Sequence, residues 1–144
     1  MLAEKATFEE VAYLLIYGKL PTQTELDAYK SKLKSLRDLP TELKVVLQNI
    51  PASAHPMDVM RTGTSMLVNL EPEGDFENQL DSINRMIATM ASIVTYWYKY
   101  SHEGVDISLI NDEDTIAGHF LHILHGKPPS ELHKKVMDTS LILY

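Results

Sequence analysis

Three histidines at regular spacing are the first residues in this sequence that could do chemistry. His119, His122 and His125 follow at steps of three, so two neighbouring imidazoles could share one side of a helix and bind a metal ion. Such steps drift by about 60° per pair around a helix, and no carboxylate stands at the fourth-residue spacing of a zinc-binding helix. The sequence therefore favours packing or hydrogen-bonded histidines, and it predicts no metal site.

A fourth histidine, His55, precedes Pro56, where an imidazole is able to polarise a substrate carbonyl. The same side chain is able to cap a helix that begins at Pro56, or to hydrogen-bond across an interface, and these structural roles are favoured. Met57, Met60 and Met66 nearby are typical of adaptable packing. No Ser-His-Asp set, glycine-rich phosphate loop or pair of catalytic carboxylates can be assembled. The sequence therefore predicts no catalytic residue, no substrate-binding residue and no cofactor.

Composition limits the class of protein and its partners. A chain of 144 residues fits one domain, and its net charge of −7 argues against a surface that follows nucleic-acid phosphates. The most basic patch is interpreted as a solvated helix face ahead of a phosphate or CoA contact; it comprises Lys30, Lys32, Lys34 and Arg37. The absence of cysteine and of a secretory signal fits a cytoplasmic protein.

The element that must position the rest is a long helix predicted over residues 75–102. Residues 86–98 carry no charge and no Gly or Pro, yet they fall short of the roughly 18 to 20 residues that cross a bilayer. An apolar stripe at steps of three or four is predicted to face the core: Leu80, Ile83, Ile87, Met90, Val94 and Trp97. Small residues on the remaining face are expected to admit a second helix: Ala88, Thr89, Ser92 and Thr95.

Capping signals predict shorter helices around this one. Helix starts are expected where a hydroxyl or a proline precedes an apolar pattern, at Thr7, Thr22, Thr41, Pro56 and Ser130. The acidic run 112–114 is predicted to favour the start of a further helix through its dipole. Core positions predicted for the last helix are Leu132, Val136, Leu141 and Leu143. With no strand pattern, the sequence predicts an all-α fold of about seven helices around one long buried helix.

Gly63 lies inside the helix predicted from Pro56, where glycine costs roughly 1 kcal/mol relative to alanine. The expected compensation is the close approach of another helix.

Four stretches together resemble the citrate synthase family. They are TFEEVAYLLIYGKLP (7–21), HPMDVMRTG (55–63), DEDTIAGHFLHILHG (112–126) and SLILY (140–144), and their order and spacing match over nearly the whole chain. The resemblance is greatest to the 2-methylcitrate synthase branch, through HPMDVMRT, the Tyr96-Trp97-Tyr98 run and Tyr144.

The resemblance implies a segment of the large helical domain of an acyltransferase that condenses propionyl-CoA, or acetyl-CoA, with oxaloacetate. In the family an aspartate removes a proton from the acyl group and a histidine stabilises the enol. The oxaloacetate-binding histidine would directly follow Tyr144 and the catalytic residues lie further on, so residues 1–144 are expected to be a single partial domain, inactive alone. An apolar helical run at residues 140–144 also suggests a piece of a longer protein.

Family members are homodimers, so the resemblance also implies an interface between copies. The helix that opens at His-Pro-Met and the long helix would form it, and the residues predicted there are Met57, Met60, Arg61, Gly63, Ala88, Ser92 and Thr95. The alternative to an enzyme segment is a helical dimerisation or interaction module that binds a partner, such as a full-length synthase subunit. Neither nucleic acid nor a membrane is expected as a partner.

Overall fold

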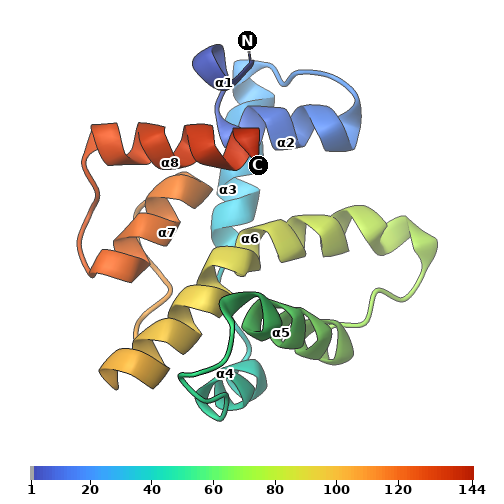
Figure 1. Ribbon diagram of the computed structural model, residues 1–144. Helices are drawn as coiled ribbons and strands as arrows, with labels where there is room; N and C mark the ends of the chain where they lie inside the picture. Colours follow the sequence, from blue (N-terminus) through green and yellow to red (C-terminus); the bar gives the residue numbers. More distant parts are fainter. Residues whose placement is uncertain (1) are drawn as a thin grey trace. The chain divides into compact units, whose positions relative to one another are not determined.

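The computed structural model describes residues 2–144, apart from the side chain of Glu77, and all regular elements in that range are helical (Figure 1). The α-helices are α1 (Leu2–Lys5), α2 (Phe8–Tyr17), α3 (Gln23–Ser35), α4 (Thr41–Gln48), α5 (Pro56–Leu70), α6 (Gln79–Tyr98), α7 (Ile116–His125) and α8 (Glu131–Leu143). A 3₁₀ turn, η1 (Phe76–Asn78), precedes α6, and a π-helical turn, η2 (Lys99–Glu103), follows it. The predicted all-α class is confirmed, and the short α1 raises the expected seven helices to eight.

The described residues form two compact units. The terminal unit comprises the residues up to Ser35 together with Asn111–Tyr144, and the central unit comprises Leu36–Ile110. Helices α1, α2, α3, α7 and α8 therefore belong to the terminal unit, whereas α4, α5 and α6 with its flanking turns belong to the central unit.

Side-chain caps begin most of the helices where the sequence predicts them. At α2, Thr7 Oγ1 accepts from the Glu10 backbone N–H at 3.4 Å, and Glu10 Oε2 accepts from the Thr7 N–H at 2.7 Å. Gly18 ends this helix in the left-handed conformation, with φ of 75°. His55 is confirmed as the cap of α5, because its Nδ1 accepts from the Met57 N–H at 3.2 Å. The cap predicted at Thr41 is wrong by one residue, since Pro40 holds that position without a side-chain bond.

The long helix is confirmed, but the beginning of its predicted apolar stripe is exposed. Leu80 and Ile83 are 44% and 40% exposed, whereas Trp97, at the other end of the stripe, is 2% exposed. The face of small residues is buried, as predicted: Ala88, Thr89, Ser92 and Thr95. Small side chains allow neighbouring backbone to come close.

In the last helix, α8, most residues predicted to be buried are exposed. Leu132, Val136 and Leu143, which the sequence places in the core, are 70%, 58% and 66% exposed. The residue that α8 buries is Asp138, at 6% exposure, and its carboxylate accepts from the Phe8 N–H of α2 at 2.9 Å. A buried hydrogen bond to a helix terminus therefore orients α8. Leu132, Val136 and Leu143 lie on the outside of the described chain, whereas Leu141, also predicted for the core, is half-buried.

Gly63 is a point of close packing between α5 and α6, which lie side by side in Figure 1. A Cβ atom added at Gly63 would stand 2.5 Å from Ile93 Cγ2, well inside van der Waals contact. This confirms the close helix approach that the sequence predicts at this glycine.

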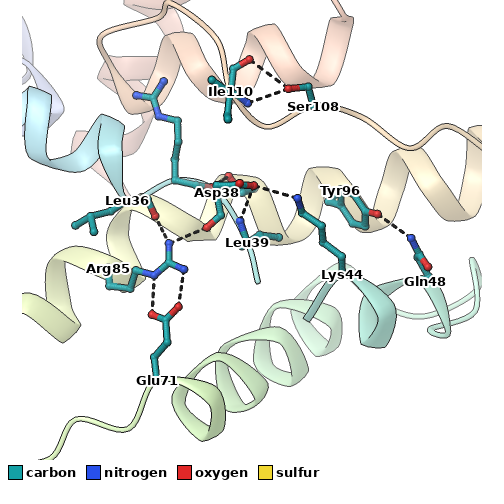
Figure 2. Close-up of polar contacts among 12 residues, drawn as sticks. Leu36, Asp38, Leu39, Lys44, Gln48, Glu71, Arg85, Tyr96, Ser108 and Ile110 are labelled. Carbon is teal, nitrogen blue, oxygen red and sulfur yellow. Dashed lines mark hydrogen bonds and ion pairs between the residues drawn. The ribbon is translucent and has the colours of Figure 1, made fainter. Parts of the chain in front are cut away.

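Arg85 of α6 ties three parts of the central unit together, as Figure 2 shows. Its Nε and Nη2 atoms bind both carboxylate oxygens of Glu71, the residue after α5, at 2.8 and 2.7 Å. Its Nη1 donates to the backbone carbonyls of Leu36 and, at 2.7 Å, of Asp38, in the segment before α4. A planar guanidinium satisfies these four acceptors at once, which no other side chain can do.

Replacing Gly63 by alanine tests the packing of α5 on α6. We expect Gly63→Ala to lower the free energy of unfolding by about 1–3 kcal/mol, because overpacking against Ile93 outweighs the better helix propensity. Urea unfolding followed through Trp97, the one tryptophan of the chain and 2% exposed, reports on the central unit. Ser65→Ala, at an exposed position of the same helix, is the control. A Gly63→Ala chain as stable as the parent would contradict the close packing.

Replacing Arg85 by lysine tests the anchoring of the segment before α4. We expect Arg85→Lys to cost about 2 kcal/mol, because an ammonium group cannot reproduce the bidentate pair and the two carbonyl bonds. The Arg85 hydrogen bond lowers the pKa of Glu71, so this contribution is present above the ordinary carboxyl pKa and is lost as pH falls through the lowered value. Arg61→Lys, in an exposed pair with Asp58, should change stability little. Equal urea midpoints for the two variants would disprove the anchoring role.

Candidate functional site

The three histidines of α7 have separate environments. His119 is fully buried and lies 2.9 Å from the side-chain amide of Asn111. His122 Nδ1 lies 3.4 Å from Glu113 Oε1, and His125 is exposed near the end of the helix. Within residues 2–144, no group of three or more His, Cys, Asp or Glu side chains is arranged to hold a metal ion. Packing and hydrogen bonding, the roles that the sequence favours, are what His119 and His122 show.

One residue of the acidic run before α7 makes a largely buried ion pair. Glu113, 8% exposed, binds Lys134 of α8 at 2.8 Å, and this hydrogen bond raises the pKa of the lysine. Gly118 leaves room for it, because a Cβ atom there would stand 2.7 Å from Glu113 Oε2. The helix itself is capped by Thr115, whose Oγ1 accepts from the Gly118 N–H at 3.0 Å. Glu113 therefore joins the start of α7 to α8, and the effect of the run on the helix dipole stays a prediction.

The seven residues predicted for an interface divide into two groups. Met57 and Arg61 of α5 are exposed, with Met57 at 62%, and Met60 is half-buried. The others are buried within the chain itself: Gly63, Ala88, Ser92 and Thr95. Ser92, for example, donates to the Arg37 carbonyl at 2.6 Å. Only the first group is on the surface of the described residues, and the interface itself stays a prediction.

Sequence analysis missed part of the exposed face of α5. Val68 is 47% exposed, and its spacing of eleven from Met57 places both within about 20° on the helix, with Arg61 between them. The signal was present, because residues at steps of four and seven share a face. Valine is among the residues most often buried, so its type alone does not predict the exposure of Val68. Met57, Arg61 and Val68 are called the outer face of α5 below.

The outer face of α5 can pack against another helix, but it carries no chemistry of its own. It offers two apolar side chains and one guanidinium, which is held by Asp58 at 3.1 Å. Leu80 and Ile83 add exposed apolar surface on α6 in the same unit. Scattered apolar residues are normal on a protein surface, whereas a large contiguous apolar patch often marks a contact surface.

No helix in the described part of the chain is both long and apolar enough to span a bilayer.

Comparison with known proteins identifies the family. The family model for the citrate synthase C-terminal domain matches residues 1–144. The 2-methylcitrate synthase of Shewanella oneidensis is 62% identical over 143 residues, which are 99% of this chain and 38% of that protein. The citrate synthase of Deinococcus radiodurans is 34% identical over 145 residues, again 99% of this chain and 38% of the relative. The chain thus spans well under half the length of these relatives.

Solved structures share the fold. A citrate synthase from Thermoplasma acidophilum, solved with carboxymethyl coenzyme A and oxaloacetate, superposes with a TM-score of 0.87 at 24% identity, over 99% of this chain and 38% of that one. The citrate synthase of Thermotoga maritima superposes with a TM-score of 0.79 at 30% identity, over 99% of this chain and 36% of that one. The helical arrangement, the capping motifs and the match along all 144 residues place this chain in the citrate synthase family.

Proposed function

We propose that this chain is part of an acyltransferase of the 2-methylcitrate synthase type, which condenses propionyl-CoA with oxaloacetate in the cytoplasm during propionate breakdown. The observation that carries the proposal is the identity of 62% to the Shewanella oneidensis 2-methylcitrate synthase, against 34% to the Deinococcus radiodurans citrate synthase over the same span. Acetyl-CoA is the alternative acyl donor, as in the citrate synthases.

In this proposal the residues described here supply scaffold rather than reacting groups. Their polar side chains bind other parts of the same chain. Arg85 donates to backbone carbonyls, Glu113 forms an ion pair with Lys134, and His119 hydrogen-bonds with Asn111. The groups that remove the proton and stabilise the enol belong to the rest of the enzyme, and acyl-CoA enters as substrate rather than as a cofactor of this chain.

A second role, contact between copies, is favoured by the outer face of α5. Met57 and Val68 expose apolar surface on one side of the helix, and the guanidinium of Arg61 lies between them. A self-complementary patch of this kind suits a two-fold dimer, in which the same helix of each copy meets the other. We assign this face to a homodimer, or to association with a full-length synthase subunit.

A chimera tests the proposed enzyme. The matching 143 residues of the Shewanella oneidensis 2-methylcitrate synthase are replaced by this chain. We expect thiol release from propionyl-CoA and oxaloacetate within about tenfold of the parent, a loss of at most about 1.4 kcal/mol, because a compatible scaffold leaves the reacting groups in place.

Two controls accompany the chimera. The parent enzyme assayed with acetyl-CoA fixes the substrate preference that the chimera should keep, and the 144-residue chain assayed alone should release no thiol above background. A folded chimera without activity, or one that prefers acetyl-CoA, would reject the methylcitrate assignment.

Charge placed on the outer face of α5 tests the contact between copies. We expect Met57→Asp and Val68→Asp each to shift the chain toward monomer in sedimentation velocity, because a carboxylate on an apolar contact must be desolvated. Leu15→Asp adds the same charge at an 80% exposed position of α2 and should leave the distribution unchanged. If the parent chain sediments as a monomer at all concentrations, or if all three variants behave alike, the contact is elsewhere or absent.

A further inference from the structure

Glu9, in the first turn of α2, is a carboxyl group that the structure buries almost completely. Its side chain belongs to a residue only 1% exposed, and its Oε1 accepts from the Ile116 N–H, at the start of α7, at 2.8 Å. Its Oε2 is buried and has no hydrogen-bond partner among the described residues. If Glu9 were ionised, its Oε2 would be buried without a hydrogen-bond donor, and this would lower the stability of the folded chain.

A second buried carboxyl group stands close by. Asp138 of α8 is 6% exposed and accepts from the N–H of Phe8, the residue next to Glu9, at 2.9 Å. A side chain of α8 thus holds the first turn of α2, and a side chain of α2 holds the first turn of α7. The negative charge of Asp138 raises the pKa of Glu9, because like charges repel most strongly away from water.

The groups that face Glu9 from each neighbouring element support a proton on it. Burial raises its pKa most, and the charge of Asp138 on α8 adds to this, while the Ile116 amide of α7 and the Lys30 charge of α3 act in the opposite direction. Tyr29 of α3, whose pKa burial raises to about 12, stays neutral and supplies no compensating charge. The balance leaves the pKa of Glu9 above its ordinary value.

We propose that Glu9 is a proton switch of the terminal unit: its Oε2 carries a proton while α2, α7 and α8 are packed together, and loss of that proton weakens the joint between α2 and α7. The step transfers one proton from the carboxyl group to solvent and changes no other bond. It does not depend on the activity proposed above.

The direction of the pH dependence follows from proton linkage. The folded chain holds this proton more tightly than the unfolded chain, in which Glu9 has the ordinary pKa of 4.5. The contribution of Glu9 to stability is therefore complete below that value, and it is lost as pH rises through the raised pKa of the folded state. This is the reverse of an ordinary ion-paired carboxylate such as Glu71.

Glu9→Gln tests the switch, because the amide is neutral at every pH and its oxygen can still accept from Ile116. Urea unfolding of the full chain is followed by far-UV circular dichroism between about pH 5 and about pH 8. We expect the urea midpoint of the parent chain to fall across this range, and the Glu9→Gln variant to lose most of that dependence. Parallel curves for the two chains would overturn the proposal.

A direct titration decides the question without relying on stability. The carboxyl carbon of Glu9, labelled with carbon-13 and assigned by Glu9→Gln, should show a titration midpoint above pH 4.5. Glu25 is the ionised reference, since its hydrogen bond with Lys19 lowers its pKa to about 2. Asp138→Asn keeps an acceptor for Phe8 but removes the charge, so the Glu9 midpoint should move down. A Glu9 midpoint at the ordinary value, or one unmoved by Asp138→Asn, would refute the switch.

Discussion

The central unit depends on one requirement: backbone carbonyls outside the helices must find donors, and α6 supplies them. Arg85 donates to Leu36 and Asp38, Ser92 donates to Arg37 at 2.6 Å, and Trp97 Nε1 donates to Ile50 at 3.2 Å. The segments before and after α4 are thereby held against a single helix. A buried carbonyl without a donor costs roughly 1–3 kcal/mol, so these bonds help to fix where α4 lies.

The terminal unit meets the complementary requirement, since the first amides of its helices need acceptors. Thr7 and Glu10 serve α2 from within, whereas Asp138 and Glu9 reach α2 and α7 from other helices. Tertiary caps of this kind join helices and satisfy their ends in one contact. They also put the carboxyl groups of Glu9 and Asp138 in the interior of this unit.

Close contacts fix the positions of the helices in the central unit. At Gly63 no room is left for a side chain between α5 and α6, and Arg85 joins four acceptors through one guanidinium. Apolar side chains of α5 and α8 remain exposed among the described residues: Met57, Val68, Leu132, Val136 and Leu143.

The sequence by itself determined the class and most helix boundaries. Capping residues act on backbone amides two or three positions away, so the starts of α2, α3 and α5 could be predicted at Thr7, Thr22 and His55, and Gly18 ended α2 for an equally local reason. The close approach at Gly63 was also predictable, because a helix keeps an interior glycine when a neighbour fills the missing side chain.

Only the tertiary structure decided which face of each helix is buried. The apolar pattern of α8 predicted Leu132 and Val136 in the core. It gave no sign of the buried carboxyl groups of Glu9 and Asp138, because each accepts from a backbone amide more than a hundred residues away in the sequence. On α6 the same counting placed Leu80 in the core, whereas the structure leaves it exposed. Hydrophobicity says how much a side chain gains from burial, whereas the choice of face also depends on how closely the backbones can approach and which distant polar groups need a partner.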